Sequence, residues 1–319
     1  MKEVEIGFCK RCLQELFDGQ KVAHELSFNS PYEEDSDSYL EHTKKIYISG
    51  VQVKYSLRLL DNELKLTDTG GQYILKPIPT GTFKFLDQAP ANEHLTMQIA
   101  KQLYKMNVPA NALMDFKDGS SAYIVRRFDQ THNHKIQQED FAQIAQMTSE
   151  THGQNYKYDL SYEEIAELIQ KYIPTYKIEL EKFFRMILFN YVFSNGDAHL
   201  KNFSVMQSEQ GDYTLTPVYD LLCTRIHSPS ESDMALDLLT DCFSNAFEAS
   251  GFYTYQDFFE FGQKIGIKDS RIRKILAEFT KSNKSVHQLI EQSNLNNECK
   301  KLYADYYEDR LKRMNINMV

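Results

Sequence analysis

Three residues whose side chains carry oxygen ligands, Asp197, Asn202 and Asp220, follow one another in an order that suits phosphoryl transfer. Asp197 comes after the apolar stretch 183–193, Asn202 lies five positions later, and Asp220 ends a short apolar run. The first Asp can orient a hydroxyl and accept its proton, while the Asn and the second Asp can hold Mg²⁺ on ATP phosphates. Mg²⁺ prefers such hard oxygen ligands. The alternative is a polar turn, with Asp197 and Asn202 as turn and cap residues.

A lysine at the end of a strand would supply the positive charge that ATP phosphates need. Residues 73–75 favour a strand, and Pro77 ends it because proline cannot donate to a ladder, which places Lys76 at the strand's end. A helix is predicted over 93–106, and Glu93 at its start can pair with Lys76. Alternatively, Lys76 is a solvated strand end and Glu93 is a first-turn charge favoured by the helix dipole.

Two further segments can complete a nucleotide site. Residues 46–57 alternate as strands do on both sides of Ser49-Gly50, and Gly50 allows a tight turn that can lie over phosphates. This turn lacks the G-x-G-x-x-G pattern, so its local signal is weak. Residues 122–129 are typical of a strand that runs into a polar segment. A hinge there would offer backbone groups to adenine, and Asp129 can reach the ribose.

The elements that position these residues predict an α+β, bilobal, protein-kinase-like fold with a small mixed β lobe and a large helical lobe. Residues 1–130 form the first lobe, with the phosphate loop and the lysine, and residues 131–319 form the helical lobe with the catalytic and metal-binding motifs. The acidic stretch 29–42 is predicted to be a loop. Ser161 and Asp269-Ser270 are expected to cap helices. In the second lobe, helices are predicted over 139–148, 162–172, 178–194, 255–265, 270–281, 286–291 and 295–313.

Composition narrows the classes of function. The formal net charge of −9 over 319 residues argues against direct binding of nucleic acid, which favours basic faces, so contact with DNA would run through a partner. No run approaches the roughly 20 apolar residues of a membrane helix, and the first eight residues lack the apolar core of a signal peptide. We therefore expect a cytoplasmic protein that does not bind membranes.

The five cysteines, an odd number, do not suggest a disulfide framework. Cys9 and Cys12 have the spacing of half a zinc site, and His24 is a candidate third ligand. No second close pair follows. The favoured interpretation is a pair of reduced thiols packed in a small N-terminal motif, with structural zinc as the alternative.

The order of these motifs resembles that of the HipA family of bacterial Ser/Thr kinases, which are the toxins of HipBA-type toxin–antitoxin systems. The resemblance covers roughly residues 9–224, and its most specific part is the ten-residue string from Asn195 to Ser204. The matching strings are Ile48-Ser49-Gly50-Val51-Gln52-Val53-Lys54, Tyr73-Ile74-Leu75-Lys76-Pro77, Ala91-Asn92-Glu93, Val125-Arg126-Arg127-Phe128-Asp129, Gln138-Glu139-Asp140-Phe141, Asn195-Gly196-Asp197-Ala198-His199-Leu200-Lys201-Asn202-Phe203-Ser204 and Leu215-Thr216-Pro217-Val218-Tyr219-Asp220.

The resemblance implies roles for individual residues and two cofactors, ATP and Mg²⁺. Asp197 corresponds to the catalytic base, and Asn202 and Asp220 correspond to the Mg²⁺ ligands. Lys76 corresponds to the lysine that binds phosphate. The remaining nucleotide-binding positions are the phosphate loop at Gly50, the hinge residues Arg126 and Phe128, and Asp129, His199 and Tyr219, which line the pocket.

The phosphate loop of this family can be autophosphorylated on serine and then leaves the ATP site. Its usual leading serine is Tyr47 in this chain, and Ser49 is the serine that remains. Shorter members, of the HipT type, can carry a serine at this second place. The resemblance therefore implies Ser49 as the autophosphorylation site.

The chain is also similar to HipT in its length, since full HipA kinases begin with an additional small subdomain that this sequence lacks before Cys9. In HipT systems a separate small protein supplies it. The expected partners are therefore a HipS-like small protein, a HipB-like antitoxin through which DNA is reached indirectly, and a protein substrate, for which the family points to an aminoacyl-tRNA synthetase.

Two other classes of function remain open at this stage. A small-molecule phosphotransferase of the aminoglycoside- or choline-kinase kind also uses D-x-x-x-x-N and a later Asp. A partner-regulated module could bind the nucleotide without turnover. The Asn-Phe-Ser continuation at residues 202–204 and the Ser49 loop favour a protein kinase over both.

Overall fold

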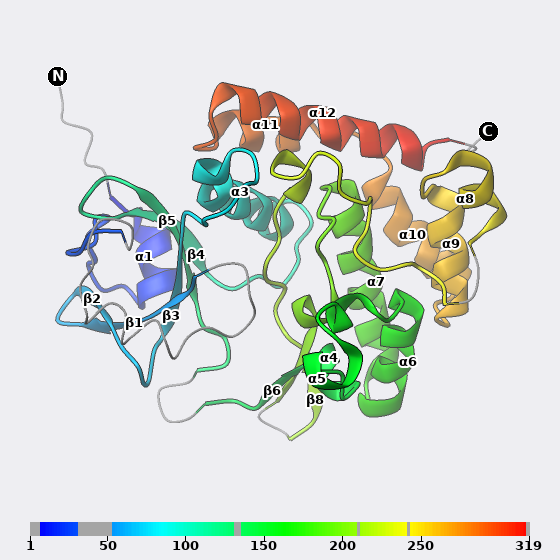
Figure 1. Cartoon of the computed structure of the whole chain (residues 1–319), viewed down its shortest axis with the longest axis horizontal. Helices are drawn as coiled ribbons and strands as arrows, with labels where there is room; N and C mark the ends of the chain where they lie inside the picture. Colours follow the sequence, from blue (N-terminus) through cyan, green and yellow to red (C-terminus); the bar gives the residue numbers. More distant parts are fainter. Residues whose placement is uncertain (1–6, 31–52, 131–134, 209–210, 241–242, 317–319) are drawn as a thin grey trace.

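A five-stranded antiparallel sheet forms one end of the molecule in the computed structural model, which describes residues 7–30, 53–130, 135–208, 211–240 and 243–316 (Figure 1). The order of the strands is β2-β1-β3-β5-β4, so β3 is central and Lys76 on it pairs with Tyr123 of β5. The strands are β1 (Tyr55–Leu60), β2 (Glu63–Leu66), β3 (Tyr73–Pro77), β4 (Asn111–Asp115) and β5 (Ser121–Arg126).

The two faces of this sheet pack against different helices. Alternation along β1 and β3 turns side chains such as Leu57 and Leu75 toward α1 (Lys10–Phe17), whose Leu16 and Phe17 join the same buried cluster. On the other face lies α3 (Ala89–Gln102), which packs on β4 and β5 and joins the much larger core of the helical lobe. Helix α3 therefore connects the two lobes and carries Glu93 toward the sheet.

The second lobe is mostly helical, with a small three-stranded sheet in the order β6-β7-β8. Its strands are β6 (Gln138–Asp140), β7 (Ser204–Gln207) and β8 (Tyr213–Leu215). Its α-helices are α4 (Phe141–Ile144), α5 (Ser149–His152), α6 (Tyr162–Tyr172), α7 (Tyr176–Val192), α8 (Asn245–Ser250), α9 (Tyr255–Lys264), α10 (Asp269–Phe279), α11 (Lys284–Gln292) and α12 (Asn297–Met314). Short 3₁₀ turns are η1 (Leu86–Gln88), η2 (Tyr156–Tyr158), η3 (Leu200–Asn202) and η4 (Thr224–Ile226).

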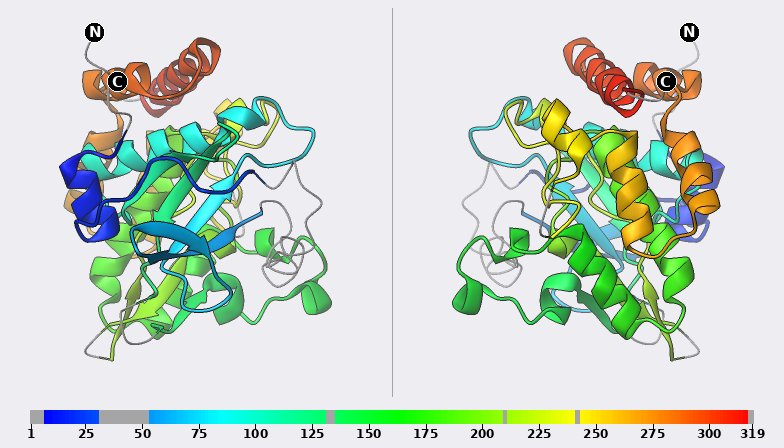
Figure 2. Two further views of the ribbon diagram at one scale, coloured as in Figure 1. Left: turned by 90° about the vertical axis from the view of Figure 1, so that its left-hand side faces the viewer. Right: turned by 90° about the vertical axis from the view of Figure 1, so that its right-hand side faces the viewer.

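Helix α7 is the centre of this lobe and ends shortly before the motif of residues 195–204. Its second half is buried almost all round, which explains why the sequence 183–193 is continuously apolar. Helices α11 and α12, in orange and red, run along one edge of the molecule and lie at that edge in both views of Figure 2. There α11 packs on α3, and α12 packs on α7.

The observed elements correct several details of the sequence prediction. The helix predicted over 139–148 is wrong: Gln138–Asp140 is a strand, and α4 begins only at Phe141. Glu139 pairs with Val205, a partner 66 positions away that local periodicity cannot reveal. Helix α3 begins at Ala89, with Pro90 in its first turn, and not at Glu93. The helix therefore starts four residues earlier than predicted, and Glu93 lies inside it.

The capping predictions had different outcomes. Ser161 is the N-cap of α6, where it forms a capping box with Glu164, as predicted. Asp269-Ser270 is not a cap, because α10 already begins at Asp269.

The cysteine pair also lies differently from the prediction. Cys9 and Cys12 are both exposed at the start of α1, with their sulfurs 3.1 Å apart, so the expectation that both thiols are packed is wrong. His24 faces Asp115, with its Nδ1 3.3 Å from a carboxylate oxygen. Among the described residues no group of three His, Cys, Asp or Glu side chains is arranged to hold a metal ion. A search of the same residues finds no helix with the length and hydropathy needed to cross a bilayer.

Candidate active site

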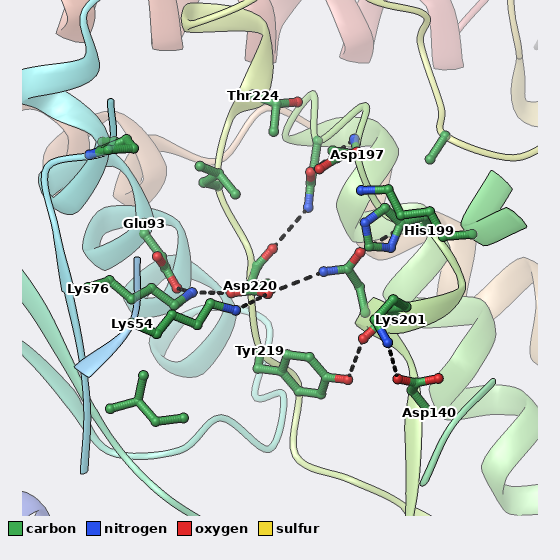
Figure 3. Close-up of a pocket in the computed structure, with 18 of the residues that line it drawn as sticks. Lys54, Lys76, Glu93, Asp140, Asp197, His199, Lys201, Tyr219, Asp220 and Thr224 are labelled. Carbon is green, nitrogen blue, oxygen red and sulfur yellow. Dashed lines mark hydrogen bonds and ion pairs between the residues drawn. The ribbon is translucent and has the colours of Figure 1, made fainter. Parts of the chain in front are cut away.

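A buried lysine holds the two lobes together at the base of the cleft between them. Lys76 Nζ lies 2.6 Å from Glu93 Oε1 and also contacts the Asp220 carboxylate (Figure 3). Lys76 and Glu93 are only 5% and 4% exposed. Burial lowers the pKa of Lys76, but Asp220 and Glu93 outweigh burial and raise the pKa above its ordinary value. The lysine is therefore a fixed positive charge.

Asp220 receives a second cation, which the sequence prediction did not include in the site. Lys54 Nζ lies 3.8 Å from Asp220 Oδ2 (Figure 3). Burial raises the pKa of Asp220, yet Lys54 and Lys76 overcome this and hold the pKa well below its ordinary value. The Asp220 backbone has φ of 55°, a left-handed conformation that is uncommon for a residue other than glycine. A persistent ionised carboxylate in this conformation suits a metal ligand.

The chain leaving α7 brings Asp197 and Asn202 to the same cleft. Asn195 is 4% exposed and fixes the turn, because its side chain contacts Asn190 at 2.8 Å and the Asp220 carbonyl at 3.3 Å. Asn202 Nδ2 lies 3.4 Å from Asp220 Oδ2. The two residues assigned to Mg²⁺ from the sequence are therefore neighbours, although 18 positions separate them.

The carboxylate of Asp197 is held by a tyrosine from outside the motif. Tyr158, in η2, donates its hydroxyl to Asp197 Oδ1 at 2.5 Å. Burial, together with this contact to Asp197, raises the pKa of Tyr158, so the phenol keeps its proton. One carboxylate oxygen of Asp197 is thus oriented, and the other can accept a proton from a substrate. Tyr158 lies in a segment without helical or strand periodicity, and no sequence signal pointed to it.

His199 has a buried nitrogen that suits a polar ligand. The residue is 8% exposed, lines the cleft, and lies edge-on to Tyr158 with ring centroids 5.2 Å apart. Burial lowers the pKa of His199 to about 4, so its imidazole is neutral at neutral pH. Its Nδ1 has no hydrogen-bond partner among the residues that the structure describes. Because buried polar atoms normally have partners, this atom is a candidate contact for a bound nucleotide.

The hinge candidates differ in how far they can serve a nucleotide. Arg126 directs its guanidinium to Asp18 of the small lobe, at 2.7 Å and 2.8 Å, and its backbone N–H donates to the Ala110 carbonyl. Phe128 packs near Tyr219, with ring centroids 5.8 Å apart, and both line the cleft. The Arg126 side chain is therefore committed to a structural ion pair, which its sequence position could not reveal.

Asp129 and Tyr219 also line the cleft. Asp129 is 7% exposed and forms a two-pronged pair with Arg127, at 2.9 Å and 2.6 Å. Tyr219 donates its hydroxyl to the Lys201 carbonyl at 2.9 Å, which ties the segment before Asp220 to the motif that carries Asn202. Ser49 and Gly50 lie outside the described residues, so the structure does not place the autophosphorylation site or the phosphate loop.

All of these described candidates line one cleft of about 1200 Å³. Lys201 and Asp140, which form an ion pair at 2.8 Å, also line this cleft, and so do Thr224 and Glu231. The cleft has the volume of a site for a nucleotide and an acceptor. The oxygen ligands of Asn202 and Asp220 fit Mg²⁺, and the two lysines fit phosphates.

Gly196, next to Asp197, must remain glycine. A Cβ there would lie 2.7 Å from the Ser232 carbonyl oxygen and 2.8 Å from Glu231 Cδ, closer than van der Waals contact allows. Gly196→Ala is expected to displace the turn and lower the rate of phosphoryl transfer about 100-fold, the typical effect of a misplacement near 1 Å. A transfer assay measures it, with Gly7→Ala as the control because Gly7 has open space around it. An unchanged rate in Gly196→Ala would show that the turn tolerates movement.

Glu231 should make stability depend on pH. Burial, together with nearby Asp197, raises its pKa to about 7, against hydrogen bonding by Thr224. Because the folded state then holds a proton that the unfolded state has released, stability should fall as pH rises from about 4.5 to 7. Glu231→Gln should weaken this fall. Urea unfolding at several pH values from 4.5 to 8 measures it, and equal pH slopes for both proteins would contradict the assignment.

The small lobe is a sheet that carries a buried lysine, and the helical lobe carries Asp197, Asn202 and Asp220. Together they define a protein-kinase-like fold. Comparison with known proteins agrees. Residues 46–286 match the family described as "HipA-like C-terminal domain". The chain belongs to this HipA-like family.

Relatives and solved structures support this assignment. A putative kinase of Haemophilus influenzae is 31% identical over 286 residues, which cover 84% of this chain and 82% of that protein. The putative kinase Y4dM of Sinorhizobium fredii is 30% identical over 207 residues, about 60% of this chain and 48% of the relative. In fold, the chain is similar to HipA of Shewanella oneidensis, whose structure was solved in complex with HipB and operator DNA, with a TM-score of 0.61, 19% identity and coverage of 90% and 72%. It is also similar to the Helicobacter pylori proinflammatory kinase CtkA, with a TM-score of 0.52, 16% identity and coverage of 82% and 90%.

Proposed function

We propose that this protein is an ATP- and Mg²⁺-dependent protein serine/threonine kinase and the toxin component of a HipBA- or HipBST-like toxin–antitoxin system. The observation that carries the proposal is the convergence of Lys76, Asp197, Asn202 and Asp220 on one cleft from three separate segments. Such convergence is what positioning and electrostatic stabilisation of a phosphoryl group require.

The reaction can be assigned to the residues of the cleft. Lys76 attracts the phosphate oxygens of ATP, and His199 and Tyr219 line the nucleotide. Mg²⁺, when bound by Asn202 and Asp220, neutralises charge that develops on the phosphates. Asp197 orients the acceptor hydroxyl and takes its proton as the oxygen bonds to the γ-phosphorus and the bond to ADP breaks. Tyr158 keeps Asp197 in place through its 2.5 Å hydrogen bond.

The partners follow from the family. The HipA structure with HipB and operator DNA supports a HipB-like antitoxin, through which this acidic chain reaches DNA indirectly. We also propose a separate HipS-like small protein as partner and a cytoplasmic protein substrate of the aminoacyl-tRNA synthetase class. Ser49 remains the proposed site of autophosphorylation. Phosphopeptide mapping after incubation with Mg²⁺ and ATP should find phosphate on Ser49, and phosphate only at other positions would remove this assignment.

The class of acceptor distinguishes a protein kinase from a small-molecule phosphotransferase. Wild-type protein with Mg²⁺ and ATP is offered, separately, dialysed protein extract and a set of aminoglycosides and amino alcohols. The proposal expects new phosphoserine or phosphothreonine in the protein fraction, absent with Asp197→Asn. Phosphate on the small molecules alone would replace the proposal with a small-molecule kinase. Bound ATP without transfer in either fraction would favour a nucleotide-binding module.

A further inference from the structure

One carboxylate outside the phosphoryl-transfer set is surrounded by three arginines. Asp233 Oδ1 lies 2.8 Å from Arg225 and 2.7 Å from Arg310, and its Oδ2 lies 2.8 Å from Arg313. Arg225 and Asp233 belong to the segment that follows Asp220, whereas Arg310 and Arg313 lie on α12. The pairing therefore ties this segment to the last described helix.

Arg310 also contacts the turn that carries Asp197, here called the catalytic turn. Arg310 is 1% exposed, and its guanidinium lies 4.7 Å from the centre of the Tyr191 ring on α7. Its Nε donates to Ser194 Oγ at 3.2 Å. Ser194 directly precedes Asn195-Gly196-Asp197, so a single buried side chain contacts both the Asp233 segment and the start of the motif that carries the catalytic base.

The segment itself packs on that turn. Thr224 accepts a hydrogen bond from the Gly196 N–H at 2.7 Å, and its hydroxyl lies 2.6 Å from Glu231. The Ser232 carbonyl, one residue before Asp233, also lies beside Gly196, so close that it leaves no room for a Cβ there. Asp233 is thus separated by one peptide unit from the carbonyl that lies beside Gly196.

The charges make Asp233 hard to replace. Burial raises the pKa of Asp233, but Arg310, Arg225 and Arg313 outweigh burial and lower the pKa, which keeps the carboxylate ionised. Another acidic partner of the cluster, Asp309, is half exposed and pairs with Arg313. Removing Asp233 would leave the buried Arg310 without its carboxylate, and uncompensated buried charges are strongly unfavourable.

We propose that Asp233 is a positioning residue that locks the segment 224–236 against the catalytic turn, in the way that a phosphate group orders the activation segment of other kinases. This inference rests on the proposed phosphoryl transfer, whose acceptor must approach Asp197 beside this segment. It implies that the segment is held for catalysis by a built-in negative charge, without phosphorylation of any residue in it.

The test compares Asp233→Asn with Asp233→Glu in full-length protein. Asp233→Asn should lower kcat for transfer to protein about 100-fold, as expected for a small misplacement of the catalytic turn. Its KM for ATP should stay within about twofold, because Lys76, Glu93 and Asp220 are untouched and uniform binding is retained. Asp233→Glu keeps the charge and should restore most of kcat. Asp309→Asn is the matched control: it removes an equal charge from Arg313 and should leave kcat unchanged.

A second readout does not depend on catalysis. Hydrogen exchange should become faster in residues 224–238 of Asp233→Asn and stay unchanged in strand β3, whether or not a substrate is known. Wild-type kcat in Asp233→Asn, or unchanged exchange in this segment, would overturn the inference. The inference would also be overturned if Asp233→Asn lost both ATP affinity and kcat and Asp233→Glu restored neither, because the substitution would then disturb the whole fold. Absence of transfer by the wild type counts against the proposed function. In that case the hydrogen-exchange comparison alone tests whether Asp233 holds the segment.

Discussion

Asp197→Asn is expected to lower the rate of phosphoryl transfer by a factor of about 10²–10⁴, the usual contribution of a positioned general base. The amide cannot take the proton of the acceptor hydroxyl. Tyr158 can still donate to the amide oxygen of the variant, as it does to Asp197 Oδ1 at 2.5 Å, so the turn should keep its geometry. Affinity for ATP should change little, because the proposed role of Asp197 concerns the acceptor hydroxyl and that of Lys76 concerns the phosphates.

A single-turnover transfer assay measures this rate, and a nucleotide titration of the same sample measures affinity. Asp159→Asn is a suitable control, because it makes the same substitution at an exposed residue. Asp159 lies two positions before Ser161, the N-cap of α6. It should transfer at the wild-type rate. Wild-type transfer by Asp197→Asn would require another residue to act as the base.

Lys76→Ala is expected to abolish transfer and also to lower the free energy of unfolding by about 3–5 kcal/mol, the cost of breaking a buried ion pair by removing one partner. Glu93 and Asp220 both depend on the Lys76 ammonium, and Glu93 is 4% exposed. Without Lys76, two carboxylates face each other at the base of the cleft. Stability and activity should therefore fall together, unlike the result expected for Asp197→Asn.

Urea unfolding and the transfer assay measure the two losses. Adding Glu93→Gln to Lys76→Ala should recover part of the stability, because it removes one unpaired carboxylate, but it should not recover transfer. Lys65→Ala, which removes a half-exposed partner of Glu63 on β2, should have little effect on either quantity. If Lys76→Ala unfolded at the same urea concentration as the wild type, the ion pairs at the base of the cleft would not be stabilising.

The parts of the site that could be predicted are those whose residues lie within short, regular stretches of sequence. Lys76 is at the end of a strand that proline terminates, and Asp197 follows a helix whose second half is buried almost all round. The sequence also indicated a Lys76–Glu93 pair, which the structure contains at 2.6 Å. Local pattern predicts these positions because each element buries one defined face and so directs the residue at its end.

The parts that could not be predicted depend on contacts between distant segments. Glu139 was assigned to a helix by periodicity, but its pairing with Val205 makes it part of a strand. Tyr158 reaches Asp197 across 39 positions, and Arg310 reaches Ser194 across 116. Asp233 lies outside the helices and strands, so only the folded arrangement reveals its three arginines.

The most direct test of the central claim follows the γ-phosphate of labelled ATP incubated with the purified wild-type protein and dialysed extract proteins. We predict transfer to protein serine or threonine that stops when EDTA removes Mg²⁺, because the cation proposed to be held by Asn202 and Asp220 would neutralise phosphate charge that an amide and a carboxylate cannot neutralise themselves. A folded protein that binds ATP with Mg²⁺ yet leaves the γ-phosphate on the nucleotide would contradict the account.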